Sequence, residues 1–254
     1  MLNRSVIYAF VACIIGLVVS AQTQQSRLDS LHSKYANKVK TLLSVGVGAS
    51  IPVSDFGLKD ANNNASGFAD LGYNINVSLA WIIKRGWGVA LMYRYQSNDI
   101  DKQSLMSQYS SKYPNIKWDI SSTPWGVNAF LLGSCNSFPI GGEDKGTFFD
   151  TKVMLGLVRS KSFGMTVIGT QGSNSATVNS PATSGTAFGY CLGLGIKREI
   201  ARDVYIGFYA DFFQSSINYG NVVTTATGGY TTTSAASQKI STVNLFASLI
   251  IRID

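Results

Sequence analysis

The chain has 254 residues, enough for one barrel or sandwich domain, and its 45% hydrophobic content is too high for a disordered protein. Only 14% of residues are charged, which is low for a soluble globule, while 25 Gly, 12 Tyr and 13 Phe favour strands and turns and argue against an all-helical protein. The net charge of +7 is spread along the chain, and its densest basic stretch, 34–40, is short, so a nucleic-acid partner is not expected.

Residues 1–21 have the features of a cleaved signal peptide. Arg4 supplies the positive charge, Val6 to Val19 is an uncharged stretch of 14 residues, and Val19 and Ala21 are small residues at the expected cleavage positions. A spanning helix needs about 20 apolar residues, so this stretch is short for one. Lipidation at Cys13 is the alternative. Residues 22–41, with weak helical periodicity, are predicted to form a periplasmic N-terminal tail.

From residue 42 to residue 254 the sequence alternates between bulky apolar and small polar residues, which predicts β-strands. In the first strand, Leu43, Val45 and Val47 alternate with Ser44 and Gly46. Eight segments follow this rule, and we predict an all-β, eight-stranded antiparallel up-and-down transmembrane β-barrel over 42–254. The segments are 43–51, 71–81, 89–96, 122–133, 148–159, 186–197, 203–214 and 241–253.

The chemistry of the two faces indicates which one is buried. In a soluble barrel the bulky residues fill the inside and charged residues cover the outside. Here the polar face consists mainly of Gly, Ser, Asn and Ala with few charges, which suits a narrow lumen, and the apolar face suits lipid. We therefore expect an integral outer-membrane barrel. The rival is a soluble ligand-binding barrel.

The connections between the predicted strands support the membrane interpretation because short and long ones alternate. The short ones are 82–86, 134–146 and 198–202, and the long ones are 52–66, 97–121, 160–185 and 215–239. Outer-membrane barrels have short periplasmic turns and longer external loops.

Aromatic residues gather near both ends of the predicted strands, as expected for two interfacial belts. The short-turn belt comprises Trp81, Trp87, Phe138, Phe148 and Phe149, and the long-loop belt comprises Tyr93, Tyr95, Trp125, Phe188, Phe212 and Phe213.

The run Val45-Gly46-Val47-Gly48-Ala49-Ser50-Ile51-Pro52-Val53-Ser54-Asp55-Phe56-Gly57, together with the eight-strand pattern, resembles the small OmpA/OmpX-like outer-membrane β-barrel proteins common in Bacteroidota. In that family a Gly-alternating first strand often continues into a Pro-x-x-Asp-Phe-like loop. The resemblance covers about 42–254 and implies an outer-membrane location more than an activity. One departure is the ending Ile251-Arg252-Ile253-Asp254, where such barrels commonly end in an aromatic residue.

Residues for catalysis or metal binding are scarce. The single histidine, His32, lies in the predicted tail, and the two cysteines of the mature chain, Cys135 and Cys191, have no CxxC or Cys/His spacing. Asp99, Asp101 and Asp119 could form an acid/base pair at the external rim, but such carboxylates are usually only solvated. We expect no enzyme and no cofactor or metal, with a lipid-modifying enzyme as an alternative.

Parity along the strands predicts which side chains fill the lumen. Arg94 and Asp211 lie on opposite walls at similar heights, so we predict an interior Arg94–Asp211 pair, with Tyr205 and Tyr209 nearby and Lys152 as a competing cation. The predicted inward side chains are bulky enough to fill the lumen: Arg94, Met92, Phe130, Lys152, Met154, Tyr205, Tyr209, Asp211, Phe246 and Arg252.

The last long loop is the candidate interaction surface. Gly228 and Gly229 are a two-residue hairpin signal between Thr-rich segments, so the last two strands are expected to continue above the membrane. Such edges could add a strand from a partner protein. We predict a monomeric structural or surface-interaction barrel, with a small-solute pore as an alternative. The candidate loop residues are Tyr219, Asn221, Thr224, Gly228, Gly229 and Tyr230.

Overall fold

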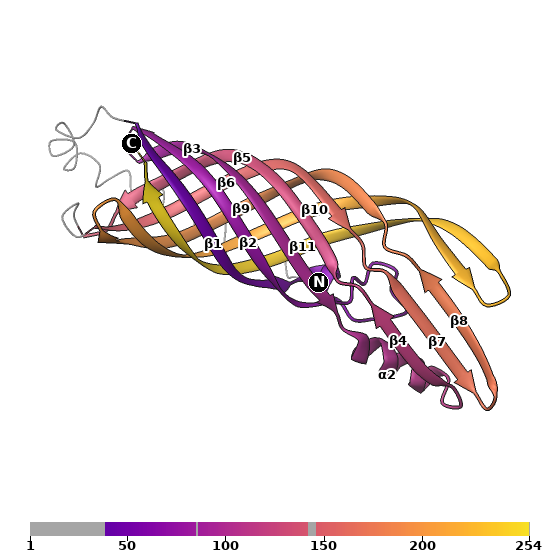
Figure 1. The fold of residues 1–254 in the computed structure, drawn as a ribbon. Coiled ribbons are helices and arrows are strands. Elements are labelled where there is room, and N and C mark those ends of the chain that lie inside the picture. The colour runs from indigo at the N-terminus through magenta and orange to yellow at the C-terminus, as the bar shows by residue number, and fades with distance from the viewer. Residues whose placement is uncertain (1–38, 85, 142–145, 254) are drawn as a thin grey trace, which may run out of the picture.

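The computed structural model describes residues 39–84, 86–141 and 146–253 (Figure 1). The predicted signal peptide, His32 and nearly all of the predicted tail lie outside these residues. The first strand begins at Lys40, two residues before the predicted start of the barrel. Eight long strands form the barrel: β1 (Lys40–Pro52), β2 (Ala69–Lys84), β3 (Trp87–Ile100), β5 (Trp125–Pro139), β6 (Thr147–Lys161), β9 (Ser184–Ala201), β10 (Val204–Ala226) and β11 (Tyr230–Arg252).

The ring closes because β11 pairs with both β10 and β1. Every neighbouring pair is antiparallel, in the order β1-β2-β3-β5-β6-β9-β10-β11. The expectation of an all-β, eight-stranded, antiparallel up-and-down barrel is confirmed. Because the ring is closed, each side chain of a barrel strand faces either the lumen or the surroundings.

One inward assignment was wrong. Phe130 on β5 is paired across the sheet with Tyr93 on β3 and with Leu157 on β6. Residues that are directly paired share a face, and Phe130 is 61% exposed with its ring 4.9 Å from that of Tyr93 on the outer surface. The inward residues of β5 are Trp125, Val127, Ala129 and Leu131.

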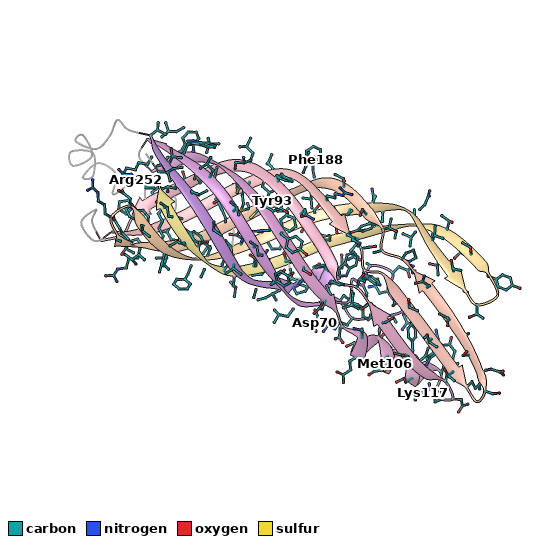
Figure 2. The ribbon with its side chains drawn as sticks, in the orientation of Figure 1. Asp70, Tyr93, Met106, Lys117, Phe188 and Arg252 are labelled. Carbon is teal, nitrogen blue, oxygen red and sulfur yellow. The ribbon has the colours of Figure 1, made fainter. Side chains whose placement is uncertain are left out.

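Apolar side chains are exposed on the outside of the barrel and polar side chains are buried inside it, as the sequence predicts. Outward residues such as Leu155, Phe188 and Phe208 are 65%, 77% and 68% exposed. Figure 2 shows Phe188 on the outside of the barrel wall. Buried polar side chains face the lumen instead, among them Arg94, Gln96 and Asp211. No helix in the described part of the chain is both long enough and apolar enough to cross a membrane.

The long connections, expected to be loops, contain structure of their own. They hold the 3-10 turn η2 (Ser54–Gly57), the helix α2 (Lys102–Lys112) and the strands β4 (Lys117–Ser122), β7 (Met165–Gln171) and β8 (Asn174–Ser180). β4, β7 and β8 pair in that order, and β8 joins the end of β10 (Figure 1). These short strands lack a long apolar alternation, and five of the seven residues of β8 are exposed, so periodicity could not reveal them.

The β10–β11 hairpin extends beyond the barrel, as expected, because each strand has 23 residues. Its connection is three residues, Thr227 to Gly229, since Ala226 and Tyr230 are still paired. Gly228 and Gly229 have φ of +90° and +81°, a conformation that glycine adopts without steric cost.

A hydrophobic plug closes the barrel at the long-loop end. Trp125 is at its centre, with its ring 5.5 Å from Phe56 and its indole N–H donating to the Gly67 carbonyl at 3.0 Å. Trp125 and Phe213 are therefore buried, and they do not belong to the long-loop belt. At the other end, Phe148 packs against the inward Tyr205, so it does not belong to the short-turn belt. The plug consists of Phe56, Trp125, Val127, Phe213, Ile217, Tyr219 and Ile240.

Candidate functional site

A layer of charged side chains crosses the middle of the lumen. Arg94 from β3 donates through Nη2 to Asp211 Oδ2 on β10, and both side chains have no solvent exposure. Lys152 Nζ on β6 lies 2.9 Å from the same carboxylate oxygen. The structure thus brings together all three charged residues that the sequence indicated, and Lys152 joins the pair instead of competing with it.

The surroundings of this layer compensate for the loss of water around the charges. Asn76 Oδ1 accepts a hydrogen bond from Arg94 Nε at 2.6 Å, and the guanidinium lies 5.7 Å from the centre of the Phe213 ring. Lys152 Nζ lies 4.9 Å from the centre of the Phe246 ring. Aromatic faces attract cations most strongly where water is excluded. The other carboxylate oxygen, Asp211 Oδ1, is buried and has no hydrogen-bond partner among the described residues.

A second pair lies closer to the short-turn end. Lys197 Nζ is 3.0 Å from Asp150 Oδ1 and 2.9 Å from Ser137 Oγ, and the Tyr209 hydroxyl donates to Asp150 Oδ2 at 2.7 Å. The sequence analysis did not select Asp150 or Lys197. Parity could have found both, because Asp150 shares the face of Lys152 and Lys197 shares the face of Cys191.

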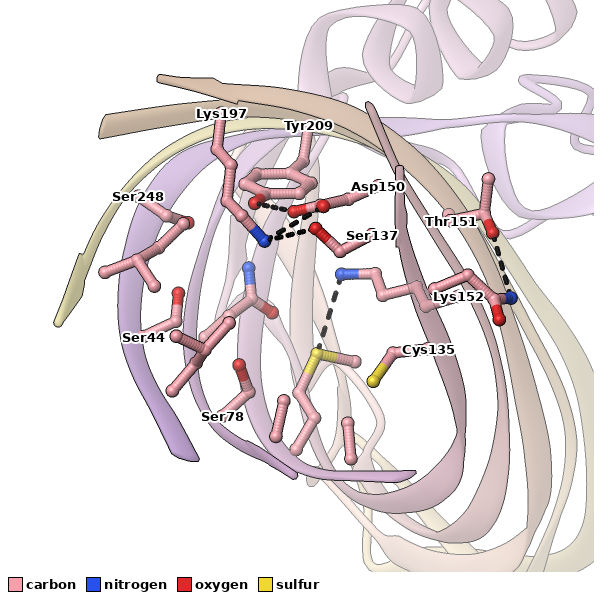
Figure 3. A pocket seen from close by; sticks show the side chains of 18 of the residues that line it. Ser44, Ser78, Cys135, Ser137, Asp150, Thr151, Lys152, Lys197, Tyr209 and Ser248 are labelled. Carbon is pink, nitrogen blue, oxygen red and sulfur yellow. Dashed lines mark hydrogen bonds and ion pairs between the residues drawn. The ribbon is translucent and has the colours of Figure 1, made fainter. Parts of the chain in front are cut away.

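Between the two charged groups the lumen contains a cavity of about 90 Å³ (Figure 3). Lys152, Lys197 and Tyr209 line one part of it, and Ser44 and Ser78 line another. Figure 3 shows the three serines Ser44, Ser78 and Ser248 on the wall across from Lys152.

At the long-loop end, Asp101 has a structural role. It is the N-cap of α2, where its carboxylate accepts from the Ser104 backbone N–H at 2.9 Å, and it lies 2.5 Å from Lys59 Nζ. Asp101 therefore contacts a cation and a helix end, and not another of the three aspartates, as the acid/base pair considered from the sequence would require. Asp99 and Asp119 are both exposed.

The contact between Asp101 and Lys59 shifts the pKa values of both side chains. Burial by itself raises the pKa of Asp101, but the hydrogen bonds from Lys59 and from Ser104 outweigh it and lower the pKa from 3.8 to about 2. The hydrogen bond to Asp101 raises the pKa of Lys59 above its ordinary value of 10.5.

The candidate interaction residues separate into two groups. Tyr219 is 2% exposed, its hydroxyl donates to Ser160 Oγ at 2.8 Å, and its ring lies 6.0 Å from Trp125, so it belongs to the plug and not to the external surface. Its assignment to an external loop was wrong because the β10 alternation continues past the barrel rim and turns it inward. The others lie on the protruding hairpin: Asn221, Thr224, Gly228, Gly229 and Tyr230.

Within the described ranges, no three His, Cys, Asp or Glu side chains are placed to hold a metal ion. Cys135 and Cys191 are both free thiols in this part of the chain.

No protein-family model matches the sequence, and no curated protein does. Among solved structures, the chain is similar to Ail, the attachment invasion locus protein of Yersinia pestis, at 13% identity and TM-score 0.42 over 84% of this chain and 99% of that one. It is also similar to a major outer membrane protein from Thermus thermophilus, at 10% identity and TM-score 0.47 over 85% and 100%.

A third similar structure is the outer membrane protease OmpT from Escherichia coli, at 7% identity and TM-score 0.33 over 85% and 95% of the two chains. Because the likenesses are this distant, the function of the chain is argued below from its own residues. The resemblance of Val45–Gly57 to Bacteroidota barrels stays a prediction.

The charged layer predicts non-additive mutational effects. Asp211→Asn leaves Arg94 and Lys152 without a counter-charge and should cost about 3–5 kcal/mol of unfolding free energy. Arg94→Gln should cost less, because Lys152 still neutralises Asp211. The double variant should lose less than the sum of the single variants. Urea unfolding in micelles, followed by the heat-dependent shift in gel mobility, measures all three. Exactly additive losses would contradict the coupling, and Lys161→Gln on the exposed surface is the neutral control.

The Asp101–Lys59 contact predicts a pH window for α2. Because the folded state lowers the pKa of Asp101, its stabilisation is complete above 3.8 and is lost as the pH falls toward about 2. Because the pKa of Lys59 is raised, its part is complete below 10.5 and is lost as the pH rises beyond that value. Hydrogen exchange at the Ser104 amide should follow this window.

Asp101→Asn is the matched control for that window. Asparagine caps helices about as well as aspartate, so α2 should form in the variant without the acid-side loss of protection. An unchanged acid transition in Asp101→Asn would assign the effect to another group. Asp101→Ala should cost the helix about 1 kcal/mol at neutral pH because the cap is removed.

Proposed function

We propose that this protein is an integral outer-membrane β-barrel. The observation that carries the proposal is the inverted burial: apolar side chains are exposed around the outside of a closed ring, and polar and charged side chains are buried inside. Soluble monomers rarely expose a contiguous apolar patch larger than a few hundred Å². An apolar outer band over a polar interior is the pattern of a barrel whose solvent is lipid.

The exposed aromatic residues at the two ends of this band support the same proposal. Trp81, Trp87 and Phe138 lie toward the short-turn end, and Tyr73 and Phe188 lie toward the other end. Amphipathic rings favour the boundary between lipid tails and headgroups.

Leu155→Lys tests the membrane proposal. Leu155 lies near the middle of β6 on the outer face, and a lysine at the bilayer midplane costs about 2–4 kcal/mol. We expect poorer insertion into lipid vesicles and lower unfolding free energy there. Arg159→Lys is the control, because Arg159 is exposed on the same face of β6 near the external rim and already places a cation there. A mature protein that stays soluble in the periplasm without detergent would refute the proposal.

We further propose a non-catalytic role in surface interaction, through the structures that extend beyond the barrel. The plug closes the lumen with side chains such as Phe56, Val127 and Ile217, which have no exposure, and this closure favours a surface role over a diffusion pore. β11 pairs with β1 only from Thr242 onward, so in the described structure residues 230–240 pair on one side alone, with β10. A free strand edge can add a strand from a protein partner.

Photo-crosslinking on intact cells tests the surface role. A photoreactive amino acid at position 230, where Tyr230 is 76% exposed, should form discrete protein adducts that an excess of purified unlabelled barrel suppresses. The same group at position 188, on the barrel wall, should not. The absence of suppressible protein adducts at 230 would contradict the proposal.

A shortened hairpin gives the matching loss-of-function variant. Joining Tyr219 to Ala236, which are paired, by an Asn-Gly turn removes 220–235 but keeps Ile217, Tyr219 and Ile240 in the plug. This barrel should keep its heat-dependent gel shift and lose any contact mapped at position 230. Stable open conductance of the full-length protein in planar bilayers would favour the pore instead.

A further inference from the structure

The cavity in the lumen has two kinds of hydrogen-bond donor on opposite walls (Figure 3). Ser44 on β1 is paired across the sheet with Ser78 on β2, and Ser248 on β11 is paired with Gly46 on β1, so the three serines lie side by side. None of the three hydroxyls forms a side-chain hydrogen bond with another described residue. These hydroxyls are free to point into the cavity.

The opposite wall supplies two ammonium groups. Lys152 Nζ has one strong acceptor, Asp211 at 2.9 Å, and a weak contact with Met92 Sδ at 4.0 Å, so it retains donor capacity. Its side chain is 17% exposed, compared with 0% for Arg94 and Asp211, because it borders the cavity. Lys197 Nζ, with two acceptors at about 3 Å, has one further N–H.

The charges around the cavity do not balance. The two ion-paired groups that border the cavity together hold three cations, Arg94, Lys152 and Lys197, and two carboxylates, Asp150 and Asp211. A buried cation without a counter-charge is unfavourable, because the interior does not replace the water that the charge loses. One negative charge in the cavity would remove this excess.

We propose that the cavity binds one small oxyanion of the size and charge of dihydrogen phosphate, between Lys152, Lys197 and the serine wall. Several donors in different directions suit an acceptor with several oxygens better than they suit a spherical ion. The volume of about 90 Å³ is well below the roughly 300 Å³ at which pockets for drug-sized ligands begin, so it suits a small oxyanion better than a nucleotide.

Gly193 lines the cavity on the wall that carries the ammonium groups. Any Cβ at this position would overlap Lys152 Cε and Asp211 Oδ1, so a larger residue would displace the ion pair beside the cavity.

The test is a titration of the full barrel in zwitterionic micelles with inorganic phosphate, in slightly acidic buffer and at constant ionic strength. The phosphorus-31 linewidth of phosphate should broaden saturably, and the temperature of the heat-dependent gel shift should rise over the same concentrations. Phenyl phosphate, which is too large for the cavity, should do neither. Equal effects of chloride, or no saturable broadening, would mean that the cavity holds only water and would overturn the proposal.

Three variants separate the cavity from the surface. Lys152→Met should weaken phosphate binding at least tenfold, whereas Lys161→Met, on the exposed end of β6, should leave it unchanged. Because Lys152→Met also alters the charged layer, Ser78→Ala supplies a variant that leaves every ion pair in place, and it should weaken binding several-fold. Binding that survives Lys152→Met and Ser78→Ala but is lost in Lys161→Met would place phosphate on the outer surface and contradict the inference.

Discussion

Closure of the ring is the constraint on which the rest of the structure depends. Once β11 pairs with β1, the eight barrel strands separate their side chains into a lumen set and an outer set. A ring of eight strands leaves an interior that side chains nearly fill, so each lumen residue must fit its neighbours in size, charge and hydrogen bonding. Gly46 and Gly48 on β1 leave room for the Phe246 ring, and Gly195 on β9 leaves room for Tyr209. The two large rings therefore stack inside, 5.4 Å apart.

The side chains that fill the lumen are arranged in layers along the barrel. At the external end, Trp125 and its apolar neighbours exclude water, and in the middle Arg94, Asp211 and Lys152 meet with Asn76 and aromatic faces around them. Below them, the lumen is incompletely filled, and the cavity lies there between two ion-paired groups. The order from apolar plug to charged layer to polar cavity explains how one narrow interior can be closed at one end and able to hold a small polar ligand at the other.

The long connections are not part of the closed ring, and other contacts hold them in place. α2 begins at a capping carboxylate that also binds Lys59 from the first long connection, and β8 attaches to β10 at Thr225 and Ala226. Together with the pairing of β4 and β7, these contacts tie all four long connections to one another above the rim. In this region β11 pairs with β10 but with no strand on its other edge among the described residues. The proposed interaction is located there because such an edge can pair with another strand.

The sequence by itself determined the strand period, the number of barrel strands and the apolar exterior, because alternation with period two depends only on local backbone geometry. It also placed Arg94, Lys152 and Asp211 in the lumen by parity. Only the tertiary structure decided that Lys152 joins Arg94 on the Asp211 carboxylate, that Phe130 faces outward and that Tyr219 is buried in the plug. Heights and neighbours in a barrel depend on the stagger between strands distant in the chain, and that stagger is set by pairing and packing around the whole ring.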